Sequence, residues 1–230
     1  MEPDLRQAPA AVPAAASEVF GAGLAVAERF AALLAGPGVE RGLIGPREAD
    51  RVWDRHLLNS AVVAELVAPG ARVLDVGSGA GLPGIALALA RPDLSVALLE
   101  PMARRVAWLE EVVAELGLAV AVHRGRAEDA VVRRRVGLWD VVTARAVAPL
   151  GRLAGWSLPL LGDGGRLLAI KGASATEEAR RDAAAVRAAG GGEVEVRTCG
   201  DGVVEPPATV VVVPRRRAAR DPRPRRRKDR

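Results

Sequence analysis

Short apolar runs alternate with longer amphipathic stretches along most of the chain. We predict a strand for each of the runs rich in valine and leucine, at 72–76, 94–99, 119–123, 139–144, 166–170, 193–198 and 208–213. Helical spacing of apolar residues predicts helices between most of them, at about 83–90, 102–116, 150–160 and 175–189. This alternation is typical of a parallel sheet with crossover helices. Only the loop Gly200 to Pro207 separates the last two strands, which predicts an antiparallel pair at one sheet edge.

The first 70 residues have a different pattern. Residues 1–16 are rich in alanine and proline, and we expect them to be disordered. Ser17 is a candidate N-cap for a helix that stops at Gly36-Pro37. A second helical stretch runs from about 47 to 67. We therefore expect an N-terminal helical cap over 17–70, followed by an α/β domain over 71–214.

The predicted fold is a three-layer, doubly wound α/β sandwich with a seven-stranded, mostly parallel sheet. Ligands of such sheets bind at the carboxyl ends of the strands where the strand order reverses. The chemistry of this chain is therefore expected just after the first, second and fourth strands.

Charge is unevenly spread over the 230 residues. The segment 215–230 holds ten Lys/Arg against two Asp, which leaves −3 for the rest of a chain of net charge +5. We expect this tail to be disordered, and two interpretations remain open: an arm that favours a polyanion, or a solubilising tail. The Arg133-Arg134-Arg135 run is a second basic feature.

Other features limit the class of protein. Cys199 is the only cysteine, so no intramolecular disulfide forms. One cysteine and two histidines are too few for a zinc site, and we expect no metal. The polar start and the lack of an apolar run of about 20 residues predict a cytoplasmic protein with no membrane segment.

A glycine-rich turn follows the first predicted strand, in the sequence Asp75-Val76-Gly77-Ser78-Gly79-Ala80-Gly81-Leu82-Pro83-Gly84. Glycines let the backbone approach a ligand closely, and a proline in the first helical turn fixes where a helix starts. Gly79 to Gly84 also fits a dinucleotide fingerprint, which alone is weak evidence. The Asp75 carboxylate would repel a pyrophosphate but would accept hydrogen bonds from the ammonium of S-adenosylmethionine. The turn therefore favours a methyl donor over a dinucleotide.

Acids follow the next two strands. Glu100 ends the second strand, where a carboxylate can bind both hydroxyls of a ribose; as a structural alternative it caps the following helix. Gly125-Arg126-Ala127-Glu128-Asp129 follows the third strand, where it would hold an adenine edge or cap a short helix.

With these motifs in hand, the chain resembles the ribosomal RNA small subunit methyltransferase G family over nearly all of 40–172. The motifs that carry the resemblance are Arg55-His56-Leu57-Leu58 with Ser60, Asp75 to Gly79, Gly81-Leu82-Pro83-Gly84-Ile85, Arg104-Arg105-Val106, Arg126-Ala127-Glu128, Ala144-Arg145-Ala146 and Ile170-Lys171-Gly172. Asn59 departs from the family pattern, which more often shows Asp at that position.

The resemblance implies a Rossmann-like class I methyltransferase that uses S-adenosylmethionine to methylate N7 of a guanine in the decoding-region loop of bacterial 16S rRNA. The expected partners are 16S rRNA, a 30S subunit or an assembly intermediate, and we expect a monomer. Family positions and the physical argument together give a predicted cofactor site of Asp75, Gly77, Gly79, Leu82, Glu100, Ala127, Glu128 and Arg145.

Guanine N7 carries no proton at neutral pH, so we predict catalysis by positioning and electrostatics with no catalytic dyad. Arg145, Lys171 and His56 are candidates for contact with the substrate. A histidine beside Asp54 on a half-buried helix is more often a hydrogen-bonded packing residue, and we favour that interpretation of His56.

Three other functions fit parts of the sequence. These are a methyltransferase acting on a small molecule or protein, a nicotinamide-dependent dehydrogenase of the same fold, and a non-enzymatic RNA-binding protein that uses the basic tail. Ligand titration and rRNA methylation assays distinguish them.

Overall fold

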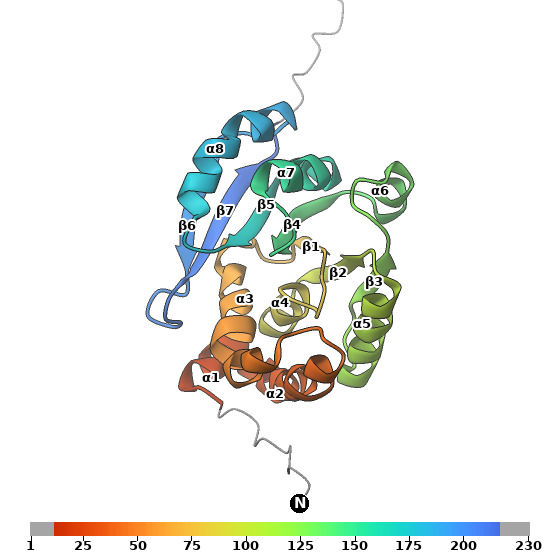
Figure 1. The fold of residues 1–230 in the computed structure, drawn as a ribbon, viewed down its shortest axis with the longest axis vertical. Helices are drawn as coiled ribbons and strands as arrows, with labels where there is room; N and C mark the ends of the chain where they lie inside the picture. Colours follow the sequence, from red (N-terminus) through yellow and green to blue (C-terminus); the bar gives the residue numbers. More distant parts are fainter. Residues whose placement is uncertain (1–11, 217–230) are drawn as a thin grey trace, which may run out of the picture.

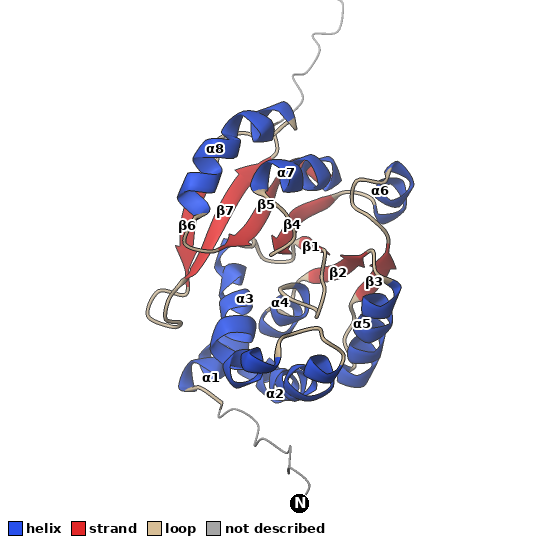
Figure 2. Cartoon of the chain, viewed as in Figure 1, coloured by secondary structure: helices blue, strands red, loops and turns tan. Residues whose placement is uncertain are grey.

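A seven-stranded sheet with helices on both faces forms the centre of the molecule (Figures 1 and 2). The computed structural model describes residues 12–216. The strand order is β3-β2-β1-β4-β5-β7-β6, and all neighbouring pairs are parallel except β5 with β7 and β7 with β6. The order reverses between β1 and β4, which confirms the predicted doubly wound, mostly parallel sheet.

The elements of the α/β part follow the predicted alternation. The strands are β1 (Arg72–Val76), β2 (Ser95–Glu100), β3 (Ala121–Arg124), β4 (Trp139–Arg145), β5 (Leu161–Lys171), β6 (Glu195–Cys199) and β7 (Ala208–Pro214). The helices are α4 (Gly84–Ala90), α5 (Ala103–Leu116), α6 (Ala130–Val136), α7 (Leu150–Ser157) and α8 (Ala175–Ala188). The antiparallel pair at the sheet edge is confirmed as β6 and β7.

Two apolar cores lie on opposite faces of the sheet. One packs the N-terminal helices, α4 and α5 against the sheet, and it includes Phe30, Trp108 and Leu109. The other packs α6, α7 and α8 against the opposite face, with Leu150 and Leu153 among its buried residues. Figure 1 shows the N-terminal helices, in red and orange, gathered beside α4 and α5.

The helical cap differs in detail from the prediction. Its first helix, α1 (Ala14–Phe20), begins three residues before Ser17, and Pro13 is its N-cap. Ala16 is fully buried, so these residues belong to the cap and not to the expected disordered segment. A short 3-10 turn joins α1 to α2 (Leu24–Leu33), and a wide helical turn carries the chain through Leu34–Gly38 instead of stopping at Gly36-Pro37.

The second helical stretch of the cap is confirmed but irregular. It combines a 3-10 segment Pro46–Arg51, a wide turn Val52–Leu58, the short α3 (Asn59–Ala61) and a 3-10 segment Val62–Leu66. This stretch brings His56 and Ser60 into the interior, where both are buried.

The sequence predicts no segment with the length and apolar character of a membrane span, and this prediction is wrong for one helix. Ala14–Gly38 meets both criteria by length and composition. Phe20, Ala27 and Phe30 of this helix pack in the core against α4 and α5, as in the core helix of a globular protein. Because 28% of its most apolar 18-residue window is buried, this packing accounts for part of its apolar character.

Other differences concern the boundaries of the α/β part. β5 begins at Leu161, five residues before the prediction, because Leu161 pairs with Trp139 ahead of an irregularity in the β4–β5 register. Of the predicted tail, Arg215 and Arg216 still bond the body through backbone hydrogen bonds to Gly165 and Gly190. The remainder of that tail, like most of 1–16, lies outside the described residues.

Candidate functional site

The glycine-rich turn leaves the carboxyl end of β1 at the point where the strand order reverses. The Gly77 amide donates to the Leu99 carbonyl at the end of β2, at 2.8 Å. Gly77 and Gly79 have φ of +73° and +55°, in the region that favours glycine. A Cβ on Gly77 would lie 2.8 Å from Cγ2 of Val147. The turn is therefore closed on one side by β2 and on the other by the loop after β4.

Asp75 lies beneath this turn and is fully buried. Its Oδ2 accepts a hydrogen bond from the Gly84 amide at 3.0 Å, which ties the start of α4 to the end of β1. Its Oδ1 has no hydrogen-bond partner among the described residues. Burial raises the pKa of Asp75 to about 7, and the hydrogen bond from the Gly84 amide offsets only part of that effect.

Glu100 joins the turn to the second strand. Its Oε2 accepts from the Gly79 amide at 3.0 Å and its Oε1 accepts from the Met102 amide at 2.9 Å. Each carboxylate oxygen has two lone pairs, so both retain capacity for a further donor. The structure thus combines the two alternatives for Glu100, because it caps the segment before α5 and also borders a cavity.

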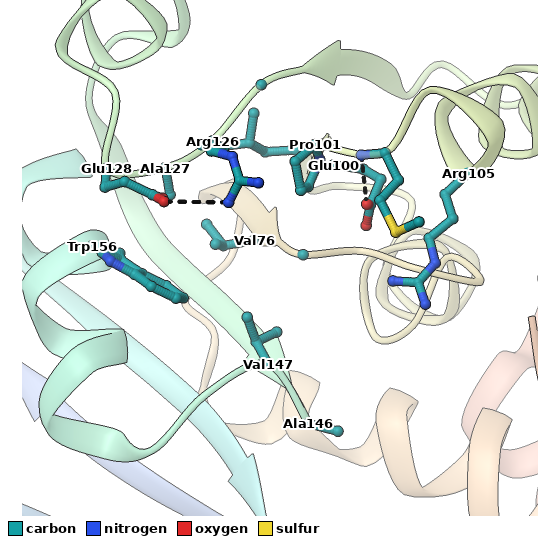
Figure 3. A pocket seen from close by; sticks show the side chains of 14 residues that line it. Val76, Glu100, Pro101, Arg105, Arg126, Ala127, Glu128, Ala146, Val147 and Trp156 are labelled. Atoms are coloured by element: carbon teal, nitrogen blue, oxygen red, sulfur yellow. Dashed lines mark hydrogen bonds and ion pairs between the residues drawn. The ribbon is translucent and has the colours of Figure 1, made fainter.

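That cavity opens between the carboxyl ends of β1, β2, β3 and β4. Its lining comprises Val76, Gly77, Leu99, Glu100, Pro101, Met102, Arg105, Gly125, Arg126, Ala127, Glu128, Ala146, Val147 and Trp156. Figure 3 shows Trp156 on the side of the cavity opposite Glu100, with Val76 between them. The lining therefore combines apolar residues with charged groups, namely the carboxylates of Glu100 and Glu128 and the guanidiniums of Arg105 and Arg126.

The segment after β3 closes one end of this cavity. Ala127 is buried in its wall, and Glu128 has 42% of its side chain exposed. The carboxylate of Glu128 faces the guanidinium of Arg126 at 3.7 Å (Figure 3). Asp129 caps α6 by accepting from the Val131 amide at 2.8 Å. Asp129 is thus the capping residue of this segment, while Glu128 faces the cavity.

The structure brings together only part of the predicted cofactor site. Gly77, Glu100, Ala127 and Glu128 line the cavity, whereas the remaining predicted residues lie outside its wall. Asp75, Gly79 and Leu82 belong to the turn and its base. The sequence predicts neither Trp156 nor Arg105 in the cofactor site, although both line the cavity.

Arg145 instead lies between the end of β4 and the helical cap. Its Nη1 donates to Oγ of Ser60 at 3.0 Å and to the His56 carbonyl at 3.3 Å, and its Nη2 lies 2.8 Å from Nδ1 of His56. Nε2 of His56 lies 3.0 Å from Oε2 of Glu48. Glu48, His56 and Arg145 therefore form a connected chain of polar groups between the cap and the sheet.

The protonation state of His56 follows from these contacts. Burial and then the positive charge of Arg145 lower the pKa of His56 to about 4, against an opposing effect of Glu48. His56 is therefore neutral at pH 7. Because arginine only donates, Nδ1 accepts and the proton resides on Nε2, facing Glu48. The predicted hydrogen-bonded packing role of His56 agrees with this geometry, although its partners are Glu48 and Arg145 and not the neighbouring Asp54.

Lys171 ends β5 in a nearly buried ion pair. Its Nζ lies 3.0 Å from Oε1 of Glu178 and donates to the Ala148 carbonyl at 2.8 Å, and the two charged side chains are 13% and 12% exposed. Glu178 also accepts from the Leu150 amide at 2.7 Å. Lys171 therefore anchors the loop after β4, although it also borders a second cavity.

Replacing Lys171 with methionine is expected to lower the free energy of unfolding by about 3 kcal/mol, because the buried Glu178 carboxylate loses its counterion. Urea denaturation of the variant measures this loss. The double variant Lys171→Met/Glu178→Leu is the control, and it should recover part of the loss because no unpaired charge remains. A midpoint for Lys171→Met equal to that of the wild type would contradict the assignment.

Solved structures share the fold of this chain. The apo form of the S-adenosylmethionine-dependent methyltransferase SibL superposes with a TM-score of 0.56 at 22% identity, covering 82% of this chain and 62% of that one. An S-adenosylmethionine-dependent O-methyltransferase from Thermotoga maritima gives 0.52 at 16% identity, with 71% and 67% covered. These likenesses, together with the glycine-rich turn at the strand reversal, define a Rossmann-like class I fold.

Sequence comparison narrows this class to one family. The model of the family described as rRNA small subunit methyltransferase G matches residues 24–205. A protein named ribosomal RNA small subunit methyltransferase G from Mycolicibacterium gilvum is 60% identical over 87% of this chain and 88% of its own length. One of the same name from Salinispora tropica is 58% identical over 94% and 91%. The chain belongs to the rRNA small subunit methyltransferase G family, as its motifs predicted.

The residues at the cavity fit S-adenosylmethionine. Its charged groups require acidic partners, and the structure offers the free lone pairs of Glu100 at the cavity and the buried carboxylate of Asp75 beneath the turn. Its adenine requires an apolar slot, which Met102, Val147 and Trp156 supply. At Gly77 the side chain of Val147 lies where a Cβ would be, so a larger residue there would crowd this slot.

Proposed function

We propose that this protein methylates N7 of a guanine in the decoding-region loop of bacterial 16S rRNA. The observation that carries the proposal is the 60% identity to a protein named ribosomal RNA small subunit methyltransferase G, over 87% of the chain. The matched region includes the glycine-rich turn, the cavity beside it and most of the helical cap. The proposal includes a cytoplasmic monomer that acts on 16S rRNA, a 30S subunit or an assembly intermediate.

Within this proposal the first cavity holds the cofactor. Glu100 accepts hydrogen bonds from the ribose hydroxyls, as acids after the second strand of such sheets do. Ala127 and Glu128 hold the adenine end, and Gly77 lies at the methionine end. Asp75, Gly79 and Leu82 act from beneath, because they set the shape and charge of the turn.

When bound, S-adenosylmethionine supplies a methyl group on a positively charged sulfur, and transfer forms the N7–carbon bond as the carbon–sulfur bond breaks. The lone pair of N7 carries no proton, so the chain needs no general base. Nδ1 of neutral His56 accepts from Arg145, and its Nε2 lies 3.0 Å from Oε2 of Glu48 without completing a hydrogen bond among the described residues, so we assign His56 no proton transfer. The residues of the site therefore act by holding the reactants in line and by excluding water.

The test is methylation of 16S rRNA by the purified protein, with the methylated nucleotide mapped by mass spectrometry of nuclease fragments. We expect one N7-methylguanine in the decoding-region loop. Naked 16S rRNA and 30S particles, assayed side by side, show which is the better substrate. Methylation of a different nucleotide, or of a small molecule or protein alone, would contradict the proposal. Binding of a nicotinamide dinucleotide in place of S-adenosylmethionine would do so as well.

A further inference from the structure

A second cavity lies beside the proposed cofactor cavity, between the helical cap and the ends of β4, β5 and β7. It has a volume of about 600 Å³ and is lined by Arg51, Asp54, Arg55, Asn59, Arg145, Ala146, Ile170, Lys171, Gly172, Ala173, Glu205, Pro206, Pro207 and Thr209. We propose that this cavity receives the acceptor guanosine, turned out of the rRNA, and that Arg145 is the side chain that contacts its base there. The inference rests on the proposed function and adds the site of its substrate.

The second cavity adjoins the proposed cofactor cavity. Ala146, in the loop after β4, lines both cavities. Methyl transfer is an in-line displacement, so the cavity of the donor and the cavity of the acceptor must adjoin each other. Ala146 has φ of +54° and is the only non-glycine residue with positive φ among residues 12–216. A backbone held in that region costs about 1–3 kcal/mol and is typical of functional sites.

The size and charge of the second cavity suit a nucleotide base. A volume of about 600 Å³ lies in the range of pockets that enclose small organic ligands, and a base extruded from a helix occupies such a pocket. Four cationic side chains line it, and carboxylates pair with three of them: Asp54 with Arg51, Glu48 with Arg55 and Glu178 with Lys171. Arg145 is therefore the lining cation without a carboxylate partner within residues 12–216, and its guanidinium suits an acceptor such as guanine O6.

The helical cap holds Arg145 by hydrogen bonds on one side of its guanidinium. Three of its contacts are inside the protein, to Ser60 and to two atoms of His56. Those contacts occupy both hydrogens of Nη1 and one of Nη2. The N–H of Nε and the second N–H of Nη2 make no hydrogen bond within residues 12–216 and are available to a ligand in the second cavity. A guanidinium that is fixed on one side and has free N–H groups on the other is preorganised to bind a ligand.

Base chemistry agrees with this arrangement. Guanine presents O6 and N7 as neighbouring acceptors, and arginine commonly binds both. Methyl transfer needs the lone pair of N7, so here the guanidinium donates to O6 alone. The product base carries a positive charge, which the guanidinium of Arg145 disfavours. The side chain that contacts the substrate base thus also promotes release of the methylated one.

Arg145→Met and Thr209→Trp test the inference in different ways, because the first removes the contact and the second fills the cavity from β7 without touching Arg145. We expect each to lower kcat/KM for 30S particles by about 100-fold. The dissociation constant for S-adenosylmethionine, measured by calorimetry, should stay within about threefold of the wild type and also shows that each variant is folded. Arg152→Met, an exposed arginine on α7, is the matched control and should leave both quantities unchanged.

His56 is a positioning residue in this proposal, and a pair of variants separates that role from a merely structural one. His56→Asn keeps an acceptor near the place of Nδ1, whereas His56→Leu removes it. We expect kcat/KM for 30S particles to fall by about tenfold in His56→Leu and to recover mostly in His56→Asn. Equal losses in both variants would contradict the positioning role.

Two outcomes overturn the inference. One is an Arg145→Met variant whose affinity for S-adenosylmethionine falls more than about tenfold while its KM for 30S particles is unchanged, which assigns Arg145 to the cofactor. The other is a Thr209→Trp variant that methylates at the wild-type rate. A wild-type protein that methylates no guanine in 16S rRNA would instead remove the proposed function itself.

Discussion

Replacing Asp75 with asparagine is expected to weaken binding of S-adenosylmethionine at pH 8 by at least about tenfold and to stabilise the cofactor-free protein at that pH by about 3 kcal/mol. The carboxylate is fully buried, and its Oδ1 has no partner among the described residues. Ionised Asp75 therefore destabilises the free protein, while its negative charge attracts a cofactor that carries a sulfonium and an ammonium. Asparagine keeps the acceptor for the Gly84 amide but removes the charge.

The pKa values of Asp75 in the unfolded and folded protein give the sign of the stability change. Asp75 ionises near pH 3.8 in the unfolded chain and near pH 7 in the folded protein. Between these values the folded protein holds a proton that the unfolded chain has lost, so the free energy of unfolding falls as pH rises from about 4 to 7. At about 1.4 kcal/mol per pKa unit the full penalty approaches ~4 kcal/mol.

Urea denaturation of wild type and Asp75→Asn at pH 5 and pH 8 measures this penalty, and calorimetric titration at the same pH values measures affinity. We expect the two proteins to be nearly equal in stability at pH 5 and the variant to be more stable at pH 8. Wild-type affinity for S-adenosylmethionine should rise more steeply with pH than that of the variant. A variant that is less stable than the wild type at pH 8 would contradict the assignment of an unpaired buried carboxylate.

Replacing Gly84 with valine is expected to lower the free energy of unfolding by about 3 kcal/mol or more. A Cβ at Gly84 would lie 2.4 Å from Cδ2 of Leu98 and 2.9 Å from Cβ of Asp75. Relief requires α4 to move away from the sheet, which also breaks the hydrogen bond from the Gly84 amide to Asp75. Both the core and the turn that precedes α4 are therefore disturbed.

Gly155→Val is the control for this substitution. Gly155 lies in α7, and a Cβ at this position would meet no atom within 4 Å, so valine there should change stability by no more than about 0.5 kcal/mol. Thermal and urea denaturation of the two variants measure the difference. Similar midpoints for Gly84→Val and Gly155→Val would show that α4 does not pack as closely on β2 as the structure indicates.

The α/β part was predictable because its signals are local. β1 (Arg72–Val76) matches its predicted bounds, since a run of apolar residues directly precedes the glycine-rich turn. The chain segments that follow Asp75 and Glu100 lie where parallel strands must end, so the place of the cofactor cavity followed from strand order. The membership of the family was predictable from the Gly81-Leu82-Pro83-Gly84 and Ala144-Arg145-Ala146 motifs.

Contacts between distant segments were not predictable from the sequence. Asp54 is close to His56 in the chain, but the irregular helical turns of the cap orient His56 toward Glu48. Arg145 is 89 residues from His56, and no periodicity indicates that the two meet. The sequence placed Arg145 in the cofactor site by family position, whereas the structure places it in the wall of the second cavity. Pairings of this kind depend on tertiary packing.

The contacts between the cap and the last two strands bear on how the protein folds during synthesis. Glu65 at the end of the cap accepts a hydrogen bond from the Gly200 amide at 2.9 Å, across 135 residues of chain. β7 lies between β5 and β6, so the sheet is incomplete until residue 214 is available. The N-terminal helices meet α4 and α5 once residue 116 has been made, but the contacts of the cap with β6 and β7 form only near the end of translation. Contacts of such long range slow folding, and an interrupted chain that lacks β7 is a natural client for chaperones and proteases.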